Sequence, residues 1–172
     1  MLILLMLMLS FTGLLSSEEI KDNKPINKEV HREMAINLFN QTWSLLEKKD
    51  RTTDEDAMMI HTAHASLFHW KIAGNAENEY IGEWQVSRVY SVLQMFEPAL
   101  YHAKRALSIC EVNQFTGYNL AYAYEGLARA YLVNKNTKMT TIYHKKSLEE
   151  SKNIKDKDDL DYLLSDLKTI IP

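Results

Sequence analysis

The chain has 172 residues, enough for one domain with a continuous hydrophobic core. Apolar residues make up 46% and charged residues 25%, and the formal net charge of −3 excludes a strong general attraction to nucleic acid or to anionic membranes. The 5 Gly and 3 Pro are too few for a many-turned β fold, so the composition favours helices with short connections. A single cysteine, Cys110, excludes an internal disulfide, and we expect it to be a small buried thiol within a helix.

Residues 1–17 form an apolar N-terminal segment with an unbroken apolar run from Leu2 to Leu9. The run is too short for a membrane span, which takes about 20 residues. It resembles the apolar part of an export signal, but no Lys or Arg precedes it and no small-x-small cleavage site follows it. A non-functional extension, an atypical export signal and a helix packed on the fold therefore stay open. We expect residues 18–28 to be a solvated linker. The expected compartment is the cytoplasm, with export as the alternative if residues 1–17 act as a signal.

Apolar residues recur at helical spacing from Glu29 onward and predict six helices and a terminal one. The expected helices span about 30–46, 53–72, 77–93, 98–113, 117–133, 138–153 and 158–172. Thr53 followed by Asp56 is typical of a helix start, and Gly74 predicts a helix end. Pro98 suits the first turn of the fourth helix, because the N–H there has no partner within the helix.

The same classes of residue return after about 40 positions, which is the signature of a structural repeat. The aligned sets are Tyr124, Leu127, Ala128, Tyr131 with Glu83, Val86, Ser87, Tyr90, and Thr140, His144, Ser147 with Ala99, Ala103, Ala106. An earlier unit contributes Trp43, Leu46, Met59, Ala63 and Ser66 to these columns. We therefore expect three helix pairs stacked in one orientation, each pair burying the apolar face of its neighbour.

These columns resemble the tetratricopeptide repeat, which has an aromatic, Leu, Gly or Ala, and Tyr on its first helix and Ala, an aromatic and Ala on its second. The resemblance covers residues 29–157 and implies an all-α, right-handed superhelix of three antiparallel pairs, with 158–172 as a capping helix. The period of that family is about 34 residues, shorter than the one here. Glu83 also stands where an aromatic residue is usual. Segments such as "HTAHASLFHW" are loosely similar to small bacterial repeat proteins, and that similarity implies no activity.

Six histidines raise the question of a metal site. His61 and His64 share one helix face, but a zinc site takes three or four ligands and the H-E-x-x-H pattern is absent. Packing roles are favoured, with a metal or small-molecule site that uses His61 and His64 as the alternative. The chain has no Gly-x-Ser-x-Gly and no Gly-rich phosphate loop, and His102 lies two helical turns from Cys110. We expect no catalysis, no metal and no cofactor.

In the repeat family, the first helices line a concave groove between their core columns. The candidate groove residues here are Lys48, Trp84, Arg88, Tyr122, Glu125 and Arg129. A row formed by Lys48, Arg88 and Arg129 would favour the carboxylate of an acidic peptide or of a C-terminus.

Alternatively, the three cations pair with Glu83, Glu125 or other local acids and keep the face soluble. The expected function is peptide or protein binding as an adaptor or regulator. No nucleic-acid or membrane partner is expected, and a homodimer stays open.

Overall fold

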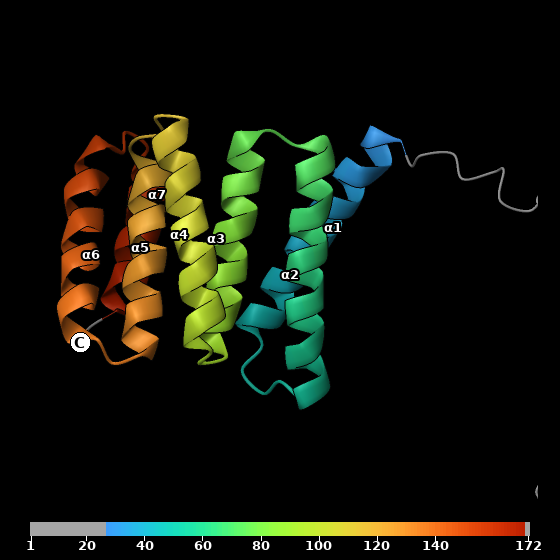
Figure 1. Cartoon of the computed structure of the whole chain (residues 1–172), viewed down its shortest axis with the longest axis horizontal. Coiled ribbons are helices and arrows are strands. Elements are labelled where there is room, and N and C mark those ends of the chain that lie inside the picture. The colour runs from blue at the N-terminus through green and yellow to red at the C-terminus, as the bar shows by residue number, and fades with distance from the viewer. Residues whose placement is uncertain (1–26, 171–172) are drawn as a thin grey trace, which may run out of the picture.

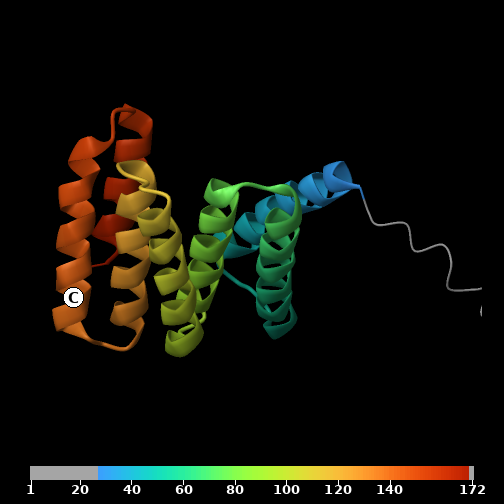
Figure 2. The same cartoon turned by 45° about the horizontal axis from the view of Figure 1, so that its top comes forward.

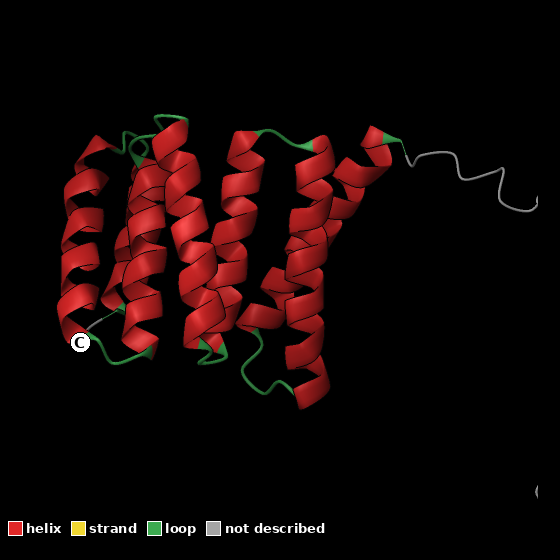
Figure 3. Cartoon of the chain, viewed as in Figure 1, coloured by secondary structure: helices red, strands yellow, loops and turns green. Residues whose placement is uncertain are grey.

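The computed structural model describes residues 27–170, so the predicted apolar segment 1–17 and most of the linker 18–28 lie outside the described residues. Within 27–170 every regular element is helical, and short loops join the helices (Figure 3). The α-helices are α1 (Lys28–Glu47), α2 (Thr53–Ala73), α3 (Ala76–Val92), α4 (Phe96–Val112), α5 (Tyr118–Val133), α6 (Thr137–Glu150) and α7 (Lys157–Lys168). A short 3₁₀ helix, η1 (Ser151–Asn153), follows α6. The predicted all-α class is confirmed.

Neighbouring helices pack antiparallel as three pairs, α1 with α2, α3 with α4 and α5 with α6 (Figure 1). The pairs follow one another in chain order, and α3 also packs directly on α5. Helix α7 packs on α5 at the far end of the array, and α1 crosses α2 obliquely at the other end (Figure 2). Three pairs with a terminal helix are thus observed as predicted, whereas the right-handed superhelix stays a prediction.

Polar side chains cap the starts of α1, α2, α3, α6 and α7. Thr52 accepts a hydrogen bond of 3.2 Å from the backbone N–H of Glu55, whose carboxylate accepts one of 2.9 Å from the N–H of Thr52. The predicted start at Thr53 with Asp56 is therefore wrong by one residue, because the longer Glu side chain reaches back to the capping residue. Gly74 ends α2 as predicted.

Three helices end in the same left-handed turn without a glycine. Gln94, Gln114 and Lys135 have φ angles of 59°, 56° and 54° and follow α3, α4 and α5. In each case the next residue donates its N–H to a carbonyl in the last turn of the helix, at 2.9 to 3.0 Å. The pairs are Met95 with Tyr90, Phe115 with Cys110, and Asn136 with Tyr131. These turns reverse the chain within a few residues, so consecutive helices lie side by side.

Small residues lie where helices approach most closely. The predicted column Ala99, Ala103 and Ala106 is at most 1% exposed. At the equivalent positions of the other pairs, Ser66 and Ser147 each donate a 2.8 Å hydrogen bond to a backbone carbonyl of the first helix of their own pair. Cys110 is fully buried, and burial raises the pKa of its thiol to about 12, so the prediction of a buried, unreactive thiol agrees with its setting.

The repeat is visible in the contacts inside each pair. Glu83 bonds to His102 and Arg105, which are 19 and 22 residues further along the chain. At the equivalent positions of the third pair, Tyr124 stacks on Tyr143 and lies beneath the ammonium group of Lys146. The second and third pairs therefore share one register.

The first pair departs from this register by one residue. Its facing residues, Thr42 and Thr62, bond at 2.9 Å and are 20 residues apart, one more than in the other pairs. Compared with the first helices of the other two pairs, α3 and α5, helix α1 is therefore shifted by one residue. Trp43 packs on Trp84, with ring centres 5.8 Å apart. The predicted alignment of Trp43 with Glu83 is wrong, because the connection in the first pair adds a residue.

Candidate binding groove

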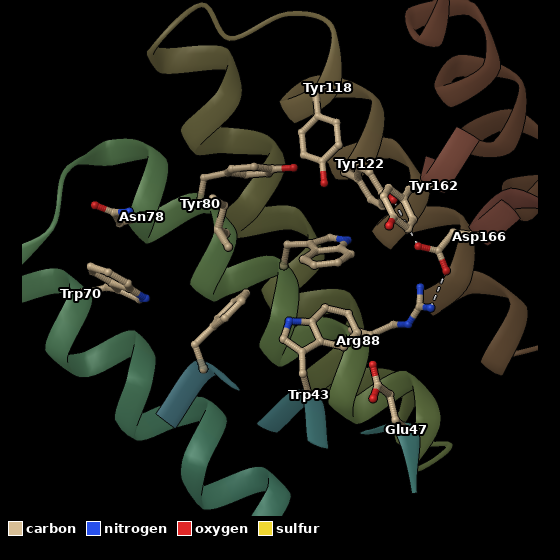
Figure 4. A pocket seen from close by; sticks show the side chains of 13 residues that line it. Trp43, Glu47, Trp70, Asn78, Tyr80, Arg88, Tyr118, Tyr122, Tyr162 and Asp166 are labelled. Carbon is tan, nitrogen blue, oxygen red and sulfur yellow. Dashed lines mark hydrogen bonds and ion pairs between the residues drawn. The ribbon is translucent and has the colours of Figure 1, made fainter. Parts of the chain in front are cut away.

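One face of the molecule carries a cavity of about 560 Å³. Helices α1, α3, α5 and α7 supply its walls, and Trp70 of α2 closes one end (Figure 4). The lining residues are Phe39, Trp43, Glu47, Trp70, Asn78, Tyr80, Ile81, Trp84, Arg88, Tyr118, Tyr122, Tyr162 and Asp166, which together we call the groove. Eight of them are aromatic, and they include all 3 tryptophans of the chain.

The aromatic wall of the groove is held by ring-to-ring packing. Tyr122 meets Trp84 edge to face, with ring centres 5.1 Å apart at 75°, and Trp84 packs in turn against Trp43. Such contacts stabilise an aromatic pair beyond simple burial. At the rim, Tyr118 and Tyr162 are 37% and 70% exposed, so their rings are available to a ligand.

A buried carboxylate holds the wall from behind. Glu125 is fully buried and accepts a hydrogen bond of 3.1 Å from the indole Nε1 of Trp84. Its other oxygen accepts bonds from Arg88 at 2.9 Å and from Arg129 at 2.7 Å. Gly126 permits this close approach, because a Cβ at that position would lie 3.2 Å from Cδ1 of Trp84. The hydrogen bond to Glu125 and the absence of a side chain at Gly126 together set the orientation of the Trp84 indole.

Charged groups gather at one end of the groove. Figure 4 shows Arg88, Asp166 and Glu47 at this end, with Trp70 and Asn78 at the other. Arg88 bonds to Asp166 at 2.6 Å as well as to Glu125. Burial opposes the charge of Arg88, but Glu125 and Asp166 outweigh it and raise the pKa of the guanidinium. Arg88 therefore remains charged, with both of its Nη atoms engaged by carboxylates.

A tyrosine hydroxyl completes this charged end. Tyr122 donates to Asp166 at 3.3 Å, and burial together with the neighbouring Asp166 raises the pKa of Tyr122 well above its usual range. The hydroxyl therefore stays protonated and acts as a donor.

The predicted groove residues divide into three groups. Trp84, Arg88 and Tyr122 line the groove, Glu125 lies buried behind it, and Arg129 pairs with Glu125 without lining the groove. Lys48 lies outside the groove and pairs with Glu55 at 2.5 Å.

The expected row of three cations is not formed, because the one-residue shift of α1 brings Glu47 to the position equivalent to Arg88 and Arg129. Of the two interpretations of these arginines, pairing with Glu125 is the one observed.

Several residues that line the groove were not among the predicted groove residues. Phe39 and Trp43 were not predicted, because the register assigned to α1 was wrong by one residue. The equal spacings from Trp43 to Trp84 and from Trp84 to Glu125 indicate the correct register. Tyr162 and Asp166 lie one turn apart on α7, and their arrival at the groove depends on how α7 docks on α5. The buried Leu163 and Leu167 mark the inward face of α7, but they do not indicate which helix receives that face.

A second charged cluster lies outside the groove, between α2, α3 and α4. Glu83, 1% exposed, bonds to His102 at 2.6 Å, to Arg105 at 2.6 Å and to Lys71 at 3.2 Å. Burial alone would raise the pKa of Glu83, but the bonds from His102, Arg105 and Lys71 outweigh burial and lower the pKa to about 2. Glu83 stands where the repeat family has an aromatic residue. Its partners His102 and Arg105 occupy the positions equivalent to Tyr143 and Lys146, which contact the aromatic Tyr124 in the next pair.

The two histidines considered as metal ligands lie apart from the groove. His61 is exposed, whereas Nε2 of His64 bonds to the Tyr90 hydroxyl at 2.9 Å. Burial and, to a smaller degree, the neighbouring His102 lower the pKa of His64. Within residues 27–170, no group of three or more His, Cys, Asp or Glu side chains is arranged to hold a metal ion.

Among helices α1 to α7, none has the length and apolar character needed to cross a membrane. No protein-family model, curated protein or solved structure matches the chain. The groove is therefore interpreted from its own geometry.

Proposed function

We propose that the chain is a peptide-binding helical-repeat module, of a type similar to tetratricopeptide repeats, which acts as an adaptor or regulator without chemistry of its own. The observation that carries this proposal is the groove of about 560 Å³, in which eight of the 13 lining residues are aromatic. A surface concentration of aromatic rings with a depression between them is typical of binding sites.

The shape of the groove suits an extended chain. Its walls come from four helices that belong to three pairs and the terminal helix, so it runs across the array instead of closing within one pair. Rigid rings such as Trp43 and Tyr162 offer contact area at a small cost in side-chain entropy, which is the property of peptide-anchoring residues. A peptide would place one or two side chains between the rings and lay its backbone along the rim.

The volume of the groove also supports a second candidate, the binding of a small organic molecule. Cavities of about 300–1,000 Å³ are usual for such ligands. The ligand would contact the aromatic rings, since His61 and His64 do not line the groove. A peptide remains the first candidate because the exposed rings of Tyr118 and Tyr162 extend the apolar surface beyond the cavity onto the rim.

The test is a screen of the full chain against an array of end-capped peptides, followed by calorimetry on the strongest binders. Trp43→Ala and Tyr162→Ala should each weaken binding by about tenfold, the range expected for an aromatic anchor. The matched control is Tyr101→Ala, because Tyr101 is 59% exposed and lies on α4 away from the groove. If no peptide bound, or if all three variants bound equally well, the proposal would be wrong.

A further inference from the structure

We propose that the groove holds a positively charged side chain of its peptide, with the guanidinium of an arginine as the best fit. The inference rests on the proposed function, because it names the ligand chemistry of the same groove. It differs from the initial expectation of a carboxylate ligand, and three observations carry it.

First, the cations near the groove are already neutralised. Arg88 and Arg129 both pair with Glu125, and both lie within ion-pair distance of Asp166, at 2.6 Å and 3.8 Å. Two positive and two negative charges therefore balance in one network. Arg88 is the only cation among the lining residues, and Glu125 and Asp166 already balance its charge, so it offers a carboxylate ligand little net attraction.

Second, the groove presents a carboxylate that forms no ion pair within residues 27–170. Glu47 lines the charged end, is exposed, and makes no ion pair or side-chain hydrogen bond with any described residue. The shift of α1 places it where Lys48 was expected. An unbalanced carboxylate beside a neutral network gives this end of the groove a negative potential.

The neighbouring wall adds to this potential. Helix α7, which supplies Tyr162 and Asp166, also carries Asp158, Asp159 and Asp161 in its first turns. Among its own residues, Lys157 neutralises only Asp161, at 2.6 Å. A cation that approaches the groove therefore meets an acidic helix on one side.

Third, the rings favour a cation over their faces. Aromatic faces carry partial negative charge and attract ammonium and guanidinium groups within about 6 Å. The planar guanidinium stacks on such rings, and its fork of donors matches a carboxylate. An arginine side chain would lay its aliphatic stem along Trp43 and Trp84 and direct its head toward Glu47 and Asp166, at the end where Figure 4 places these carboxylates.

The experiment is calorimetry of the full chain with end-capped pentapeptides that differ only at the central residue. Arginine is compared with citrulline, its neutral analogue of the same shape, and with glutamate. The arginine peptide should bind about tenfold more tightly than the citrulline peptide, since a partly desolvated cation on aromatic rings beside a carboxylate contributes about one tenfold step in affinity. The preference should shrink at high ionic strength, because part of it is exposed electrostatics.

Two variants locate the effect within the chain. Glu47→Gln should reduce the arginine preference to about twofold and leave the affinity for citrulline unchanged. Glu33→Gln is the matched control, since Glu33 is an exposed carboxylate on the same helix that does not line the groove. It should keep the full preference.

The outcomes separate this inference from the function on which it rests. Equal affinity for arginine and citrulline, or tighter binding of glutamate, would overturn the ligand chemistry and leave peptide binding intact. Loss of the arginine preference in Glu33→Gln as well as in Glu47→Gln would also overturn it. If the array finds no peptide that is sensitive to Trp43→Ala, the proposed function itself fails.

Discussion

The indole of Trp84 donates a hydrogen bond of 3.1 Å to the buried carboxylate of Glu125, which occupies the equivalent place 41 residues later in the chain. One repeat thus positions the aromatic side chain of another. The same Glu125 holds Arg88 and Arg129, so the aromatic wall and the charged end of the groove share a single support.

Replacing Trp84 with phenylalanine tests this support. Trp84→Phe keeps a ring in the groove but leaves one oxygen of a fully buried carboxylate without its donor, so we expect a loss of about 1–3 kcal/mol in the free energy of unfolding. Chemical denaturation measures the loss. The matched control is Trp43→Phe, because the indole N–H of Trp43 makes no hydrogen bond with residues 27–170. Equal losses in the two variants would contradict the role given to the Trp84–Glu125 bond.

The Glu83 cluster predicts a defined response to acid. The pKa of Glu83 is lowered in the folded chain from 4.5 to about 2, so its contribution to stability is complete above about pH 4.5 and is lost as the pH falls toward 2. Glu83→Gln should therefore cost about 3 kcal/mol near neutral pH and progressively less below about pH 4.5.

Denaturation of both proteins at a series of pH values checks this response. Glu79→Gln is the control, because Glu79 also pairs with Lys71 and Arg105 but is 33% exposed, and its effect should be small at every pH. A penalty for Glu83→Gln that stays constant between about pH 6 and pH 3 would contradict the assignment.

The left-handed turn after α5 predicts a stabilising substitution. Lys135 is exposed and adopts a φ of 54°, a conformation that disfavours every residue with a Cβ. Lys135→Gly should raise the free energy of unfolding by about 0.5–1 kcal/mol, because glycine removes the clash.

The control for this substitution is Lys145→Gly, an exposed site inside α6, which should lower stability by about 1 kcal/mol. The account of these turns fails if both substitutions lower the melting temperature.

The fold could be predicted from the sequence because periodic apolar residues and a repeated pattern of small residues persist along the chain. Ala99, Ala103 and Ala106 allow close helix packing in the structure, as their spacing indicated. The register of α1 was predicted wrongly, because the alignment carried the spacing of the second helices over to α1, whereas the spacing of Trp43 and Trp84 indicates the shift. The shift of α1 by one residue places Glu47 at the groove where Lys48 was expected, so a negative charge stands in place of a positive one.

The candidate site was predictable only in part, for a related reason. Trp84, Arg88 and Tyr122 follow from the repeat, since they lie between its core columns. Tyr162 and Asp166 belong to the terminal helix, whose buried Leu163 and Leu167 indicate an inward face but not where on the array that face docks. The cluster around Glu83 does leave a sign in the sequence. Glu83 is followed by His102 and Arg105 at the same spacings at which the aromatic Tyr124 is followed by Tyr143 and Lys146.

The most direct test of the account uses the indole N–H signals of the full chain in a ¹H–¹⁵N correlation spectrum. All 3 tryptophans line the groove, so these signals report on that site alone among the described residues. Titration with the arginine pentapeptide should shift the indole signals of Trp43 and Trp84 in a saturable way, and the shifts should be much smaller in Tyr162→Ala. Saturable binding in calorimetry with all three indole signals unmoved would contradict the claim that the groove is the peptide site.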